Sequence, residues 1–195
     1  PVINTQPASR TNNAGTTATF GVGAAGTALT YQWKKNGANL SDGGTVSGAT
    51  TANLTLATVA QSDANSYSVG VTGPDGTLAS GVATLTVIDG PVITGPPVGR
   101  TNNAATVATF AVTVTGTTPL HYQWRKNGLA VTDGGNVLGA TTATLTVSGV
   151  LNADEGSYSV QATNPAGSVV SSDAVLVVID PVINTQPASR TNNAG

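Results

Sequence analysis

A seven-residue stretch decides the fold: Tyr-Gln-Trp-Lys-Lys-Asn-Gly at residues 31–37, which returns as Tyr-Gln-Trp-Arg-Lys-Asn-Gly at residues 122–128. Each copy holds one of the two tryptophans of the chain and ends in Asn-Gly. A tyrosine and a tryptophan two residues apart lie on the same face of a β-strand. Asn-Gly readily adopts the positive φ angles of a tight hairpin turn. The stretch therefore predicts the central strand of a β-sandwich, followed at once by the next strand.

The sequence repeats itself, and the repeat sets the domain organisation. The two copies align at an offset of 90 at their start and of 91 from the tryptophan onward, because the second copy has one extra residue before its tryptophan. We predict one domain over residues 1–90, a second over residues 91–180, and the opening strand of a third copy over residues 181–195. The very short, proline-containing junctions predict that neighbouring domains sit end to end with little swing.

The composition excludes several classes of partner. Only 8 % of the 195 residues are charged and the net charge is −2, so the chain has no basic face for nucleic acid or anionic lipid. No apolar run approaches the roughly 20 residues that span a bilayer. Cysteine and methionine are both absent, which favours an exported protein with no sulfur to oxidise. With neither an initiating methionine nor a signal peptide, the sequence is interpreted as a piece of a longer chain.

Alternating apolar residues predict about seven short strands in each copy and no helix. In the first copy, Ala18, Phe20, Val22 and Ala24 share one face of a strand, and the second copy repeats this pattern. The opening of each copy is extended and contains proline, as an edge strand does. The fold class is therefore all-β, with two tandem two-sheet sandwiches.

Several spacings in this pattern resemble a known family. A tryptophan lies in the middle of each domain, and Leu54-x-Leu56 precedes Asp63-x-x-x-Tyr67-x-Val69. This is similar to the immunoglobulin superfamily, intermediate type, in the bacterial form that lacks the disulfide. The resemblance covers both domains end to end and implies immunoglobulin-like β-sandwiches.

The resemblance also implies which residues form the core. In that family two cysteines pair across the sheets beside the tryptophan, and here valines occupy the matching positions. A disulfide of this kind contributes about 2–5 kcal/mol, of which buried valines recover part at roughly 1.5–3 kcal/mol each. Two tyrosines match the tyrosine corner of the family. The implied core residues are Trp33, Trp124, Tyr67, Tyr158, Val22, Val69, Val112 and Val160.

The sequence offers little for catalysis or for binding a metal or cofactor. His121 is the only histidine, so a catalytic triad or a histidine-based metal site has nothing to build on. Asp63 and Asp154 match a position at which, in the family, a carboxylate usually caps backbone N–H groups. We therefore predict a chain with no catalytic residues, no metal and no cofactor.

Two other chemistries are weaker alternatives. Calcium could stiffen the domain junctions, but each offers a single carboxylate, Asp89 or Asp180, whereas calcium takes six to eight oxygens. A lysine–asparagine cross-link would start from Lys34 or Lys35, but alternation places Lys34 outside and Lys35 next to the turn. Two glycosylation patterns in the first copy do not recur in the second, and we interpret them as coincidence.

The end of the chain repeats its beginning. Residues 181–195 are identical to residues 1–15 at all 15 positions, whereas residues 91–105 match residues 1–15 at 9 of 15. Folding has no reason to preserve the polar residues of this segment as well, so the identity indicates a two-domain unit copied recently within a longer array. These polar residues are Asn4, Gln6, Ser9 and Asn12. The residues expected to form the assembly strand are Val2, Ile3, Val182 and Ile183.

The sequence therefore predicts a non-catalytic structural repeat unit of a bacterial extracellular array, forming a surface stalk or filament. Its partners would be neighbouring immunoglobulin-like domains of the same array or identical chains, joined end to end, the latter by strand addition. The alternative is an adhesive or carbohydrate-binding module of an exported protein. Against that alternative, all eight aromatic residues fall on inward strand positions, which leaves no exposed platform for a sugar.

Overall fold

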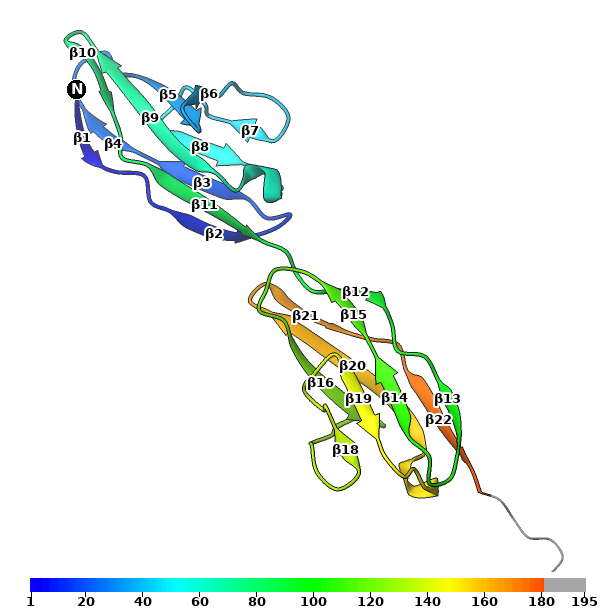
Figure 1. The fold of residues 1–195 in the computed structure, drawn as a ribbon. Helices are drawn as coiled ribbons and strands as arrows, with labels where there is room; N and C mark the ends of the chain where they lie inside the picture. The colour runs from blue at the N-terminus through cyan, green and yellow to red at the C-terminus, as the bar shows by residue number, and fades with distance from the viewer. Residues whose placement is uncertain (181–195) are drawn as a thin grey trace, which may run out of the picture. The chain divides into compact units, whose positions relative to one another are not determined.

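The computed structural model describes residues 1–180, and its chain divides into two compact units. We refer to residues 1–90 as domain 1 and to residues 91–180 as domain 2. Each is a β-sandwich with a single short 3-10 helix (Figure 1), and each is described by itself.

Domain 1 has eleven strands and the helix η1 (Gln61–Asp63). The strands are β1 (Val2–Thr5), β2 (Arg10–Asn13), β3 (Ala18–Gly21), β4 (Gly23–Ala25), β5 (Thr30–Lys35), β6 (Ala38–Asn39), β7 (Val46–Ser47), β8 (Asn53–Leu56), β9 (Ser66–Gly73), β10 (Gly76–Ala79) and β11 (Ala83–Ile88).

Domain 2 has the same elements in the same order, with the helix η2 (Asn152–Asp154). Its strands are β12 (Val92–Gly95), β13 (Arg100–Asn103), β14 (Ala108–Ala111), β15 (Thr113–Thr115), β16 (His121–Lys126), β17 (Leu129–Ala130), β18 (Val137–Leu138), β19 (Thr144–Val147), β20 (Gly156–Asn164), β21 (Gly167–Val170) and β22 (Ala174–Ile179).

Two sheets face each other in each domain. In domain 1 the larger sheet has the order β2-β11-β9-β5-β6, with β10 paired to β9, and the smaller sheet has the order β3-β8-β7. The strands β1 and β4 form a separate two-stranded ladder. Strand β2 runs parallel to β11, whereas the other pairs are antiparallel. Domain 2 reproduces this topology strand for strand.

The strand count is higher than the seven or so predicted, because two predicted strands divide where they change partners. The stretch from Ala18 to Ala25 first pairs with β8 and then, beyond Val22, with β1. The backbone N–H of Val22 donates to Ala52 at 3.0 Å, outside either ladder. Likewise the opening strand divides around the buried Pro7 into β1 and β2, since proline has no N–H for a ladder. Short hairpin strands such as β6 and β7 account for the rest.

The core of each domain is built around its tryptophan. Trp33 is fully buried, and the centre of its ring lies 6.2 Å from that of Phe20 on the smaller sheet. Phe20 in turn stacks on Tyr67 at 5.0 Å. The indole N–H of Trp33 donates to the carbonyl of Thr51 at 2.9 Å, so the one polar group of the ring is satisfied. Trp124, Phe110, Tyr158 and Thr142 repeat this arrangement in domain 2.

The Asn-Gly turns have the conformation that the sequence predicts. Asn36 and Gly37 have φ angles of +50° and +83°, and Asn127 and Gly128 have +49° and +82°. In domain 1 the two turn residues join Lys35 directly to its cross-strand partner on β6. Positive φ at both positions is the signature of a type I′ hairpin, and this turn fixes which residues of β5 face the core.

We expect Trp33→Ala and Trp124→Ala each to destabilise their own domain by about 3–5 kcal/mol, because each removes a fully buried ring. Chemical denaturation followed by circular dichroism would measure the loss. Leu129→Ala is the matched control, since Leu129 lies in the same hairpin as Trp124 but is 76 % exposed, and it should change stability by less than about 0.5 kcal/mol. A tryptophan variant losing under about 1 kcal/mol would contradict the assigned role.

Candidate interaction surface

The tyrosine at the start of β9 ties the helix η1 to the sheet. The hydroxyl of Tyr67 donates to the carbonyl of Asp63 at 2.9 Å, and Tyr158 makes the same bond to Asp154 at 2.7 Å. The carboxylate of Asp63 accepts the backbone N–H of Ala60 at 3.1 Å. Both aspartates therefore serve as the structural caps that the resemblance implied, since Asp154 accepts the equivalent N–H at 2.9 Å.

The environment of these tyrosines disfavours their ionised form. Burial raises the pKa of Tyr67 to about 12, and the nearby negative charge of Asp63 adds to the shift. Burial likewise raises the pKa of Tyr158 to about 12, with a further contribution from Asp154. Since a phenolate here would lose both solvation and its donated hydrogen bond, the hydroxyl stays protonated at any physiological pH.

The four valines at the positions that resemble the family's cysteines are buried in the two cores. Val22 and Val69 belong to one apolar cluster with Trp33. Val112 and Val160 belong to the corresponding cluster of domain 2. In each pair one valine directly follows a strand of the smaller sheet, β3 or β14, and the other lies on β9 or β20, two residues after the tyrosine.

The one ion pair within residues 1–180 joins two elements of domain 1. The ammonium of Lys35 lies 3.2 Å from the Asp63 carboxylate and donates to the carbonyl of Ser62 at 2.8 Å. Neither partner is an asparagine amide, so the contacts of Lys35 do not favour a lysine–asparagine cross-link. The pairing was missed from sequence because Lys35 and Asp63 lie 28 positions apart and only the hairpin register brings them together.

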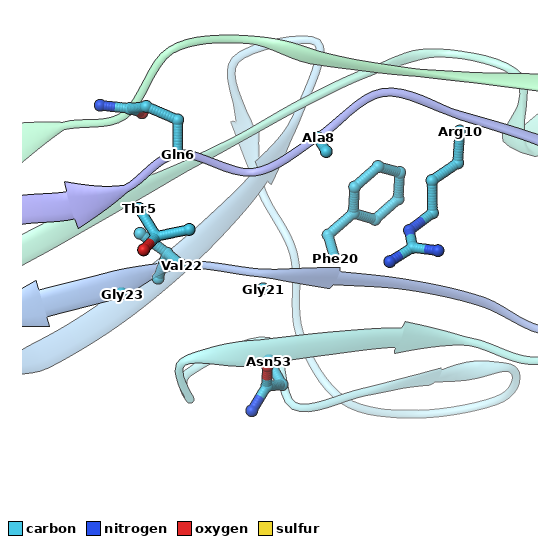
Figure 2. Close-up of a pocket in the computed structure, with 9 residues that line it drawn as sticks. All are labelled: Thr5, Gln6, Ala8, Arg10, Phe20, Gly21, Val22, Gly23 and Asn53. Atoms are coloured by element: carbon cyan, nitrogen blue, oxygen red, sulfur yellow. The ribbon is translucent and has the colours of Figure 1, made fainter.

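Domain 1 has a shallow hollow of about 420 Å³ beside its opening segment (Figure 2). Two glycines, Gly21 and Gly23, form one wall of the hollow. Their lack of a side chain leaves space beside Asn53, because a Cβ on Gly21 would lie 2.9 Å from the side-chain oxygen of Asn53. The guanidinium of Arg10 extends along the hollow near the ring of Phe20. The remaining lining residues are Thr5, Gln6, Ala8 and Val22.

Domain 2 replaces most of this polar lining. The positions of Gly21 and Asn53 hold Ala111 and Thr144, and the position of Gln6 holds Pro96. Of the polar lining residues only the arginine persists, as Arg100, while the apolar Phe20 and Val22 persist as Phe110 and Val112. This set of polar side chains around the hollow therefore occurs in domain 1 alone, although domain 2 has the same strands.

The surface of domain 2 carries more apolar side chains than that of domain 1. Along the outward face of β22, Val175 and Val177 are 50 % and 43 % exposed, where domain 1 has Thr84 and Thr86. Other exposed apolar residues of domain 2 stand where domain 1 has alanine, serine or threonine: Val98, Val107, Leu129, Leu138, Leu151 and Val170.

No group of three or more histidine, cysteine, aspartate or glutamate side chains within residues 1–180 is placed to hold a metal ion. His121 lies exposed at the first position of β16. In the same part of the chain, no helix has both the length and the apolar character needed to cross a membrane.

Comparison with protein families identifies the family of both sandwiches. The model of the immunoglobulin I-set domain matches residues 1–87 and again residues 91–178. The chain belongs to the immunoglobulin I-set family. Its two I-set domains follow one another with only a short junction between the matched ranges.

Solved structures with the same fold include fragments of titin, Sidekick-1 and Drosophila OTK. The I-band fragment I67-I69 from titin superposes with a TM-score of 0.76 at 23 % identity, covering 92 % of this chain and 65 % of that one. Sidekick-1 immunoglobulin domains 1-4 give 0.75 at 21 %, covering 91 % and 48 %. Extracellular domains 3-5 of Drosophila OTK give 0.68 at 24 %, covering 91 % and 61 %.

The chain thus spans about half to two thirds of the length of these three structures. Identities of 21–24 % show a shared tandem I-set fold. No curated protein matches the chain.

A cross-link should form where the family resemblance places cysteines. We expect Val22→Cys with Val69→Cys, and Val112→Cys with Val160→Cys, to form disulfides under oxidising conditions, because both pairs lie in the I-set cores. The required Cα separation is roughly 4.4–6.8 Å. Thiol counting and mass spectrometry would detect the bond without background, since the chain has no cysteine. Free thiols in the folded variants would show that the register relative to the family is wrong.

The tyrosine corners should make stability fall in alkali. A folded-state pKa of about 12, above the ordinary tyrosine pKa of 10.0, means that the unfolded chain releases these protons first. The contribution is therefore fully present below about pH 10 and is lost as the pH rises towards 12. We expect the free energy of unfolding to fall more steeply over this window in the natural chain than in Tyr67→Phe/Tyr158→Phe. Urea denaturation at pH 9 and at pH 11 would measure this free energy for both proteins. An equal loss between the two pH values in the natural chain and in the variant would contradict the prediction.

Proposed function

We propose that this chain is a non-catalytic structural repeat unit of a bacterial extracellular array that forms a surface stalk or filament. The observation that carries the proposal is the identity of residues 181–195 with residues 1–15 at all 15 positions, against 9 of 15 for residues 91–105. A two-domain period of 180 residues is the expected product of copying an I-set pair within an array.

The structure shows which of these identities folding explains. Asn12 donates to the carbonyl of Thr17 at 3.0 Å, and Asn102 makes the equivalent bond in domain 2. The expectation that folding has no reason to preserve Asn12 is therefore wrong.

Other polar positions of the segment are dispensable for the fold. Gln6 and Ser9 accept backbone N–H groups in domain 1, but domain 2 forms the same strands with Pro96 and Gly99 instead. Asn4 is exposed. Identity at these positions supports recent copying rather than structural need.

The location and the partners follow from the composition and the repeat. The absence of cysteine and methionine, together with 8 % charged residues, suits a protein exposed to oxidants outside the cell. In such an array each domain would contact its neighbours, or identical chains would join end to end. The expectation that Val182 and Ile183 repeat the strand made by Val2 and Ile3 lies outside the described residues and stays a prediction.

Immunogold electron microscopy of native cells, with antibodies raised against this chain, tests the proposal. We expect label along surface stalks or filaments, with protease shaving of intact cells removing it. Sequence beyond this segment should show further 180-residue copies. Label confined to the cytoplasm, or a neighbouring hydrolase domain in place of further copies, would contradict the structural role.

An adhesive or carbohydrate-binding module is the second candidate, and the hollow of domain 1 favours it. Arg10, Asn53 and Gln6 offer polar groups to a small polar ligand, whereas the ring of Phe20 is only 1 % exposed and provides no stacking platform. Glycan-array binding that is lost in Arg10→Ala but kept in Arg100→Ala would favour this candidate over the structural role.

A further inference from the structure

The opening strand of each domain faces its partner strand through a pair formed by one threonine and one glycine. The two domains place these residues on opposite strands. In domain 1, Thr5 of β1 faces Gly23 of β4. In domain 2 the order is reversed, and Gly95 of β12 faces Thr113 of β15. Both ladders have the same irregularity just before this pair. At this pair each ladder therefore places one threonine opposite one glycine, with the two residues exchanged between the strands.

The space between the strands admits only one of the two side chains. A Cβ added to Gly23 would lie 2.9 Å from the hydroxyl oxygen of Thr5 and 3.0 Å from its Cβ. A Cβ added to Gly95 would lie 3.1 Å and 3.2 Å from the same atoms of Thr113. The branched threonine cannot move its Cβ without moving the backbone. Two threonines at this pair would therefore force the strands apart.

Two glycines would fit but would weaken the ladder. Glycine within a strand loses more conformational entropy on folding and contributes no side chain to pack. A threonine–threonine pair and a glycine–glycine pair would thus both destabilise the ladder, and the threonine–threonine pair would destabilise it more.

The first residues of the opening strand do not distinguish the domains. Residues 1–3 and residues 91–93 are both Pro-Val-Ile, and Ile3 and Ile93 each pack against the core of their own domain. Neighbouring repeats of similar sequence are prone to exchanging such strands as they fold.

We propose that β4 and β15 are acceptor strands of two different specificities. Strand β4 accepts an opening strand that presents threonine to Gly23, and β15 accepts one that presents glycine to Thr113. The partner of each surface is the opening strand of a like domain, in the same chain or in a second copy. This specificity follows from residues 1–180 and does not depend on where the protein is located.

Stability measurements on the full chain test the packing. We expect Gly23→Thr to lower the melting temperature of domain 1 by roughly 4–8 °C, and Thr5→Gly added to it to restore most of the loss. The matched control is Ala25→Thr on the same strand, which copies the Thr115 of domain 2 and should shift the melting temperature by less than about 2 °C. An unchanged melting temperature for Gly23→Thr, or no recovery in the double variant, would overturn the proposal.

Strand exchange between chains tests the specificity itself. A donor chain carrying Val2→Cys is unfolded and refolded together with an acceptor chain carrying Ala25→Cys or Thr115→Cys, which mark the positions opposite Val2 on β4 and opposite Val92 on β15. Oxidation then traps an exchanged strand as a mixed disulfide, distinguished by a size tag on the donor.

The expected yield of mixed dimer is several-fold higher with the Ala25→Cys acceptor than with the Thr115→Cys acceptor. Adding Thr113→Gly to the second acceptor should raise its yield towards the first, because the clash with Thr5 is removed. An unchanged yield from the Thr115→Cys acceptor after Thr113→Gly would show a packing role without specificity and would also overturn the proposal. Equal yields from the two acceptors, zero included, would overturn the proposal.

Discussion

Both domains depend on a buried tryptophan that joins their two sheets in a chain without cysteine. Trp33 holds its own strand from both sides, because its N–H donates to Ala49 at 2.8 Å and its carbonyl accepts the N–H of Leu40 at 2.9 Å. Its ring meets Phe20 from the opposite sheet, and its indole N–H is fixed to Thr51. Aromatic contacts of this kind contribute about 0.5–1.5 kcal/mol beyond the area they bury. The sheets are thus joined by packing and directed hydrogen bonds.

The Asn-Gly turn after this strand does more than reverse the chain. The side-chain oxygen of Asn127 accepts the N–H of Ser157 at 2.9 Å, which anchors the hairpin to the strand that carries the tyrosine corner. The residue beside it is Gly156, where a Cβ would lie 2.6 Å from that same oxygen. Domain 1 has Asn65 at this position, and there the Asn36 amide donates to it at 2.8 Å. The turn asparagine therefore anchors the hairpin in both domains, although its neighbour is a glycine in one domain and an asparagine in the other.

The sequence was sufficient for those features that depend on local pattern. Strand alternation and the tryptophan spacing predicted the sandwich, and Asn-Gly predicted the turn conformation, because each is determined within a few residues. The division of a strand at Val22 was not predictable, since nothing local marks the point at which its partner changes. The same holds for the ion pair of Lys35 with Asp63 and for the hollow beside Arg10. Both need the three-dimensional register of strands distant in sequence.

Some pairs of facing residues differ between the two domains at both positions. Where domain 1 has Lys34 and Gly70, domain 2 has Arg125 and Gln161, whose side chains form a hydrogen bond of 2.7 Å. Both residues of this pair have changed, as both have at the threonine–glycine pair of the opening ladder.

At the threonine–glycine pair the shared fold constrains the sum of the two facing side chains more tightly than either residue alone, as close packing requires. The tryptophan contributes a ring contact, a side-chain hydrogen bond and two backbone bonds at once. No exchange with one neighbour could compensate for its loss. This is why the tryptophan, and not the strands that happen to surround it, identifies the fold in the sequence.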